Sequence, residues 1–257
     1  MRTRAEMKQV AKQTFNRSTG VFIPIAAILI AAGFIASVPN SINNLATNSQ
    51  LSELLNQTST LTSRDNSVSQ WQLDQLNRTW ANGGMYSLLS LQLGLLSIAL
   101  SLGLAVLQVG LSNVALFASA GGEPTFSQFA AHLKDFGRWL ALYVLMLVFV
   151  TLWSMLFLIP GIIASYRYRL AAYLMLEDPR LGALEAITHS KRLMKGYKGR
   201  LFVLDLSFFW WYLLSGITLS FAGLYVLPYR ELTNVQFYRD LRFESSMEGL
   251  SITAHAL

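Results

Sequence analysis

Three charged residues lie in otherwise apolar stretches and are the side chains best placed to do chemistry. Arg167 and Arg169 follow a Pro-Gly pair, and Asp205 is the only acidic residue between positions 201 and 229. An ionised carboxylate inside a membrane helix costs about 2.5–3.5 kcal/mol on insertion scales, so such a residue needs a partner or a function. Asp205 together with Arg167 or Arg169 predicts a polar site within the membrane, coupled to a proton or an ion.

A simpler interpretation is that these residues lie near the membrane surface. Asp205 follows Arg200 closely in the sequence, and five residues correspond to only about 7.5 Å along a helix. In this interpretation its partner is Lys198, Arg200 or Arg169. Arg167 and Arg169 then extend their charges toward the interface. A third interpretation makes the two arginines a pocket for an anionic lipid headgroup or an anionic substrate.

The elements that carry these residues are long apolar helices. Residues 79–122 contain no Asp, Glu, Lys or Arg, although about 20 apolar residues suffice to cross a bilayer core as a helix. Further charge-free runs begin at Thr19, Trp139 and Leu206. Of the 257 residues, 53% are hydrophobic and only 13% are charged, against about 25% charged in soluble domains. We therefore predict an all-α fold, a polytopic transmembrane helical bundle with interfacial amphipathic helices beside the spans.

The distribution of charge predicts how often the chain crosses. Segment 177–200 carries six basic residues and is assigned to the cytoplasmic side, where basic loops are retained. Segment 119–138 carries Lys134 and Arg138 and is assigned, on this weaker signal, to the same side, so residues 139–176 must leave and return, turning at Pro160-Gly161. This predicts five to six crossings, with one helix broken at Pro160-Gly161. The alternative is four crossings with a re-entrant limb.

The chain is predicted to form a single integral membrane domain, residues 1–257. Residues 40–84 are polar with little net charge and are expected to form an extracytoplasmic insertion, either a helical hairpin or a flexible loop. Residues 177–200 are expected to form a basic amphipathic helix in the cytoplasmic interface. The basic side chains predicted to contact anionic lipid are Lys191, Arg192, Lys195, Lys198 and Arg200.

The sequence carries no signature of catalysis or of a cofactor. It has no cysteine, and its three histidines, His132, His189 and His255, lie in two basic helices and a tail, so neither a metal nor another cofactor is predicted. Motifs for phosphate, dinucleotide, zinc-protease and serine-hydrolase sites do not occur. The net charge of +6 lies in short segments beside apolar runs, which indicates anionic headgroups and not nucleic acid as partner. We therefore expect no enzymatic activity.

Short motifs between Phe157 and Tyr238 resemble a known family. They are Leu158–Tyr166 (LIPGIIASY), Ala183–Ile187 (ALEAI), Ser190–Gly196 (SKRLMKG), Leu201–Phe208 (LFVLDLSF), Trp211–Leu214 (WYLL) and Leu227–Tyr229 (LPY). Together they are similar to the bacterial integral membrane proteins catalogued as domain of unknown function 975. The resemblance implies a multi-pass helical protein of a bacterial cytoplasmic membrane, without an established activity.

Two functions remain open from the sequence. The first is a non-catalytic protein that organises or binds other membrane components, with membrane lipids as partners and other membrane proteins as a second class of partner. The second is a small transporter or lipid-handling protein with a site near the Pro160-Gly161 break, because transporters bind substrates where helices are interrupted. In both cases the basic N-terminal segment, with five Lys or Arg residues up to Arg17, is expected in the cytoplasm.

Overall fold

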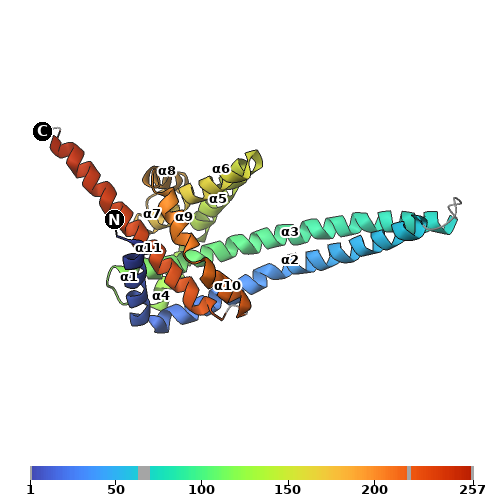
Figure 1. Ribbon diagram of the computed structural model, residues 1–257, viewed down its shortest axis with the longest axis horizontal. Coiled ribbons are helices and arrows are strands. Elements are labelled where there is room, and N and C mark those ends of the chain that lie inside the picture. Colours follow the sequence, from blue (N-terminus) through green and yellow to red (C-terminus); the bar gives the residue numbers. More distant parts are fainter. Residues whose placement is uncertain (1, 63–69, 219–220, 256–257) are drawn as a thin grey trace. The chain divides into compact units, whose positions relative to one another are not determined.

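The computed structural model describes residues 2–62, 70–218 and 221–255, and the regular structure in these ranges is helical without strands (Figure 1). The helices, in chain order, are α1 (Arg4–Arg17), α2 (Thr19–Thr62), α3 (Gln70–Ser119), α4 (Phe126–Ala131), the 3-10 helix η1 (His132–Asp135), α5 (Phe136–Leu156), α6 (Leu158–Tyr168), α7 (Ala171–Glu177), α8 (Ala183–Leu193), α9 (Lys198–Leu206), α10 (Phe209–Ile217) and α11 (Gly223–His255). The predicted all-α class is confirmed.

Four helical segments within these ranges are long and apolar enough to cross a membrane. They are Thr19–Leu45, Leu88–Ser119, Phe126–Leu156 and Lys198–Ile217. The last combines α9 and α10. Only 11–28% of the residues in their apolar windows are buried inside the protein, so most of these apolar side chains are left for lipid or a partner to cover. The protein is therefore a helical membrane protein.

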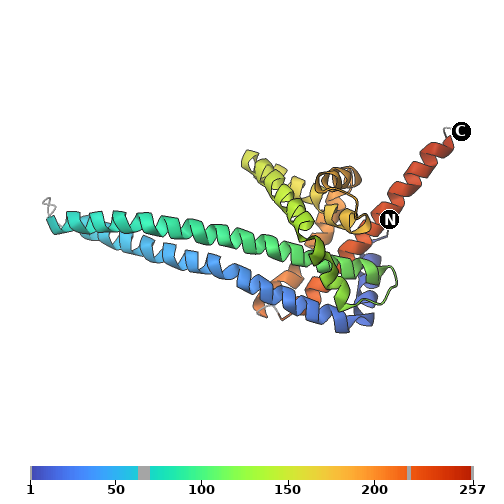
Figure 2. The ribbon, with the colours of Figure 1, turned by 180° about the vertical axis from the view of Figure 1, so that it is seen from behind.

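The chain divides into two compact units, residues 1–31 with 102–257 and residues 32–101. In the second unit the later part of α2 and the earlier part of α3 run side by side (Figure 2). Its described apolar side chains are largely exposed; Phe34, for example, is 68% exposed. A hairpin of this kind suits an apolar environment and not water.

The first helical span does not end at Pro39-Asn40, although proline often ends a helix. Helix α2 continues to Thr62, and α3 begins at Gln70. In lipid the backbone has no water to bond, so a proline removes one hydrogen bond without ending the helix. Within segment 40–84 the helical hairpin is therefore the alternative that fits; residues 63–69 lie outside the described residues. The extracytoplasmic side of this segment stays a prediction.

The helix break predicted at Pro160-Gly161 lies at Phe157 instead. Phe157 has an extended backbone, with φ −160° and ψ 148°, and it separates α5 from α6. Pro160 lies in the first turn of α6, where its missing N–H is not needed. Helix α6 has 11 residues, about 16 Å of rise, which is too short to cross a bilayer core of about 30 Å. The out-and-back geometry fits the re-entrant alternative better than a full crossing.

The predicted helix over 177–200 is also shorter than expected. Helix α8 begins at Ala183, because Gly182 has an extended backbone and donates its N–H to Glu185 at 3.2 Å. The preceding residues form a turn in which Asp178 accepts a hydrogen bond from the Arg180 N–H at 2.9 Å. A left-handed Gly196, with φ +88°, then separates α8 from α9. Segment 177–200 is therefore a turn, a short helix and the start of another.

The first unit has its core around α1 and α11. Thr3 and Glu6 form a capping box that starts α1, and its buried face is Met7, Ala11 and Phe15, spaced at i, i+4 and i+8 as one helix face requires. These side chains belong to the same buried cluster as Leu232, Val235, Tyr238 and Leu241 of α11, whose 3–4 residue spacing is that of one helix face. Helix α11 begins at Gly223 and contains Pro228.

Gly161 is expected to be the glycine on which the α5–α6 hairpin depends. A methyl group added at Gly161 would meet the Ser154 side chain and lie 2.9 Å from Ser154 Cα. We therefore expect Gly161→Ala to destabilise the protein by about 1–3 kcal/mol through overpacking. Gly103→Ala is the matched control, because nothing lies within 4 Å of its added methyl group, and helix propensity favours alanine by up to about 1 kcal/mol. Thermal unfolding in detergent measures both; equal or higher stability of Gly161→Ala would contradict the close approach.

Candidate functional site

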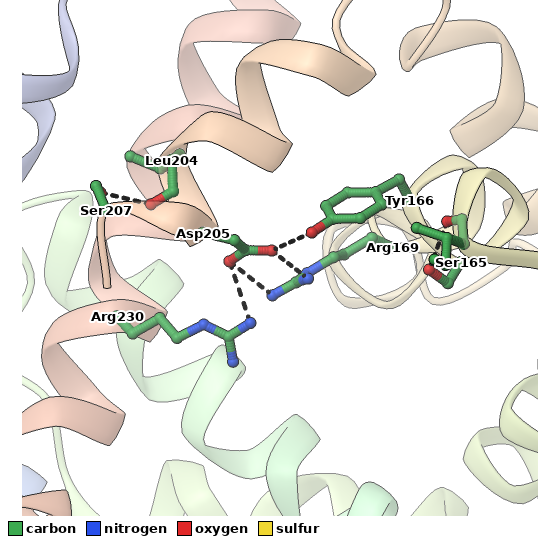
Figure 3. Close-up of polar contacts among 8 residues, drawn as sticks. Ser165, Tyr166, Arg169, Leu204, Asp205, Ser207 and Arg230 are labelled. Carbon is green, nitrogen blue, oxygen red and sulfur yellow. Dashed lines mark hydrogen bonds and ion pairs between the residues drawn. The ribbon is translucent and has the colours of Figure 1, made fainter. Parts of the chain in front are cut away.

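Asp205 lies at the meeting point of three helical segments (Figure 3). It is in the last turn of α9, and its carboxylate accepts a hydrogen bond from Arg169, at the end of α6, with Nη1 to Oδ2 2.7 Å. Arg230, in α11, donates from Nη2 to the other oxygen at 3.2 Å. One carboxylate therefore holds two guanidinium groups that are 61 positions apart in the sequence.

Aromatic side chains surround this ion cluster. The Tyr166 hydroxyl donates to Asp205 Oδ2 at 3.1 Å. The Arg169 guanidinium lies 5.9 Å from the Tyr166 ring centroid, and Arg230 lies 5.5 Å from that of Tyr212. Such cation–π contacts stabilise a cation that has lost part of its water. We name Tyr166, Arg169, Asp205 and Arg230 the Asp205 cluster.

The Asp205 cluster has one more positive than negative charge. The side chains of Arg169 and Arg230 are each 27% exposed, while that of Asp205 is 14% exposed. Within the described residues the Nε of Arg230 is buried and has no hydrogen-bond partner. The arrangement has two chemical capacities. It ties α6, α9 and α11 together, and its surplus positive charge, still within reach of the surface, favours an anion.

The structure brings together two of the three residues predicted for this site. Arg169 pairs with Asp205, and this is one of the three partners that the sequence allowed; Lys198 and Arg200 form no ion pair with Asp205. Arg167 is separate, since no hydrogen bond or ion pair of its guanidinium group is described, and its backbone carbonyl accepts from Ser190 Oγ at 2.7 Å.

Two members of the Asp205 cluster, Tyr166 and Arg230, were not predicted as site residues from the sequence. Tyr166 adjoins the arginine pair, but nothing in its spacing indicates a bond to a residue in another helix. Arg230 had a usable signal, because a charge that follows a long apolar run needs an acidic partner. Asp205 is the only acid in that run, so the pair was open to inference before the fold was known.

A second polar cluster is built around a buried carboxylate. Glu231 is 7% exposed. One of its oxygens accepts hydrogen bonds from Ser112 Oγ at 2.5 Å and from the Tyr173 hydroxyl at 2.7 Å. These donors come from α3 and α7, so Glu231 fastens α11 to both. Both described donors are neutral hydroxyl groups, and none of the described ion pairs includes Glu231.

The two histidines whose side chains the structure describes do not lie together. His132 is buried in η1 and shares a hydrogen bond with the Val106 carbonyl oxygen at 2.8 Å, while His189 is exposed on α8. The side chain of His255 lies outside the described residues. Across the described part of the chain, no group of three or more His, Cys, Asp or Glu residues is placed to hold a metal ion.

Asp205→Asn is expected to destabilise the protein by about 1–3 kcal/mol, because hydrogen bonds to a charged acceptor are weakened and two neighbouring cations lose their counter-ion. Arg167→Gln removes a charge from the same region as a matched control and is expected to change stability by less than about 0.5 kcal/mol, since its guanidinium has no described partner. Thermal unfolding midpoints in detergent report both effects. If the two variants unfolded at the same temperature, the Asp205 cluster would not be a structural link.

Comparison with known proteins places the chain in a family. A profile of the family described as "Protein of unknown function (DUF975)" matches residues 1–245. The match extends well beyond residues 157–238, which carry the sequence resemblance, and it includes segment 40–84. No curated protein and no solved structure gives a significant match. Because the profile covers nearly all of its length, the chain belongs to the DUF975 family.

Proposed function

We propose that this protein is a non-catalytic integral membrane protein that binds and organises other membrane components, with anionic lipids as its first partners. The observation that carries the proposal is the surface around α8 and the start of α9. We name its outward basic residues the basic surface; they are Arg192, Lys195, Lys198 and Arg200. A bacterial cytoplasmic membrane offers the headgroups that such a surface fits.

The basic surface has positive charge that the described chain does not neutralise. Arg192, Lys195 and Arg200 are exposed, and none of the described ion pairs involves them. Apolar side chains lie beside them, with Leu184 57% and Phe202 49% exposed. Charge next to exposed apolar surface is the arrangement that lies at the boundary between headgroups and acyl chains.

Lys191, the remaining predicted lipid contact, has a different environment. Its ammonium group lies 5.5 Å from the Phe149 ring centroid and 5.4 Å from that of Tyr168. These rings hold the ammonium group against α5 and α6. Its contribution is therefore to attach α8 to the hairpin, which sets the orientation of the basic surface.

The alternative function, transport or lipid handling at the Pro160-Gly161 break, finds no polar lining at that place. The residues at the turn, Phe157, Leu158 and Ile159, are apolar and 70–73% exposed. Polar backbone and side chains are what transporters present where a helix is interrupted. An exposed apolar tip supports insertion into lipid or against a partner helix, which agrees with a role in membrane organisation.

Lipid retention tests the proposal. Arg192, Lys195 and Arg200 are changed together to Gln, and the protein is purified from nanodiscs that contain phosphatidylglycerol in phosphatidylcholine. Each lost contact is worth about 1 kcal/mol near the membrane surface, so retained phosphatidylglycerol, counted by native mass spectrometry, should fall roughly tenfold or more. The charge-retaining triple variant Arg192→Lys, Lys195→Arg and Arg200→Lys is the control. Unchanged retention in the Gln variant would refute lipid binding by the basic surface.

The proposed orientation is tested by reporter fusions. We expect a fusion after Thr60 to report the extracytoplasmic side and a fusion after Ser190 to report the cytoplasm, because basic segments remain inside. A cytoplasmic signal at Thr60, or an external one at Ser190, would reverse the orientation.

A further inference from the structure

A polar pocket lies between α1 and α11, away from both the Asp205 cluster and the basic surface. Its volume is about 680 Å³, within the range of small-molecule sites. Helix α11 lines it with residues at i, i+3, i+4 and i+7, which are Gln236, Arg239, Asp240 and Phe243. The other walls are the start of α1, with Arg2, Glu6 and Val10, and Ser119 at the end of α3.

Three of the four charged groups in this pocket are already engaged. Arg2 and Asp240 form an ion pair in which Nη2 and Nε both donate to Oδ1, at 2.7 and 2.9 Å, and the Arg2 backbone N–H donates to Oδ2 at 3.0 Å. Glu6 accepts a hydrogen bond from the Thr3 N–H at 2.7 Å. This bond from the backbone of Thr3 is the main reason that the pKa of Glu6 lies below its usual value. Glu6 therefore stays ionised and occupied at the start of α1.

Arg239 is the charge that remains. Its Nη1 donates to the carbonyl oxygen of Ser119 and, at 3.2 Å, to Ser119 Oγ. Both acceptors are neutral, and none of the described ion pairs includes Arg239. The rest of the guanidinium fork is left to bind an oxyanion in a bidentate manner.

Gln236 adds a second donor on the same helix face, one turn before Arg239. The residue is 2% exposed, and its Nε2 is buried without a hydrogen-bond partner in the described chain. A buried amide donor without an acceptor is costly, so an acceptor atom supplied by a ligand would relieve it. Phe243 and Val10 provide apolar wall beside these donors.

We propose that this pocket binds a phosphate group through Arg239 and Gln236, with the apolar wall receiving the organic part that carries the phosphate. The Arg2–Asp240 pair closes the pocket on the α1 side and keeps Asp240 from repelling the anion. The phosphate belongs either to a soluble phosphorylated compound or to a lipid headgroup, because both present the same oxyanion.

The experiment uses the full chain in detergent free of phospholipid, titrated with inorganic phosphate in a calorimeter. Arg239→Gln and Gln236→Leu are each expected to weaken binding by roughly tenfold to a hundredfold, since each removes a hydrogen bond to a charged acceptor. Arg242→Gln is the matched control: it removes one charge from the same helix but from a surface pair with Glu177, 3.2 Å long and half exposed. It should bind like the unchanged protein.

A second arm identifies the source of the phosphate. The same four proteins are placed in nanodiscs of phosphatidylcholine with or without phosphatidic acid, and retained lipid is counted by native mass spectrometry. Retention that depends on Arg239 and Gln236, without affinity for inorganic phosphate, supports a lipid headgroup; affinity for inorganic phosphate supports a soluble ligand. If Arg239→Gln fails to fold, Gln236→Leu decides, because its amide Nε2 has no partner to lose. The proposal is overturned if neither probe binds the unchanged protein, or if both variants bind as it does.

Discussion

Apolar side chains that the chain itself does not cover are the constraint on which the rest of the structure depends. In the four membrane-capable segments at most 28% of the apolar window is buried inside the protein, so lipid or a partner must supply the remaining contacts. In such surroundings an unsatisfied polar group costs several kcal/mol. Each polar side chain on these helices therefore needs an acceptor or a donor close by. Ser97, for example, donates to the Gly94 carbonyl of its own helix at 2.8 Å.

The same constraint explains why the two acidic clusters differ. Glu231 is surrounded by neutral hydroxyl donors and is sealed from the surface, which suits a permanent link between helices. Asp205 is closer to the surface, shares its charge between two arginines and leaves a positive excess. Replacing Glu231 removes two buried hydrogen bonds and so affects stability, whereas a more exposed cluster of unequal charge is also open to ions and headgroups around it. Of the two clusters, that of Asp205 is therefore the better candidate for a functional role.

The sequence predicts the elements of this fold better than their ends. Charge-free runs locate the spans because composition alone determines which segments lipid accepts. The α11 face was predictable from its 3–4 residue spacing. Pro39 was misleading, since a local helix breaker is overridden when no other backbone partner exists. The break at Phe157 depends on how closely Gly161 approaches Ser154, which is a tertiary contact and has no local signal.

The residues of the site, like the ends of the helices, could be predicted from the sequence only in part. A carboxylate in an apolar run predicted that Asp205 has a basic partner, and Arg169 was among those considered. Distance along the sequence did not identify the partner of Asp205, because it favours Lys198 and Arg200 over Arg169. The choice is made by the hairpin of α5 and α6, which carries the end of α6 to α9, and by α11, which brings Arg230 to the same carboxylate.

Helix α11 is the element that joins these features. Three of its charged residues have polar partners in different parts of the first unit. Arg230 binds Asp205 of α9, Glu231 binds α3 and α7, and Asp240 binds Arg2 ahead of α1. Apolar residues between them fill the core. Lipid could not satisfy such charges, so the part of α11 that carries Arg230 and Glu231 is packed against other helices, and its polar contacts link it to α3, α7 and α9.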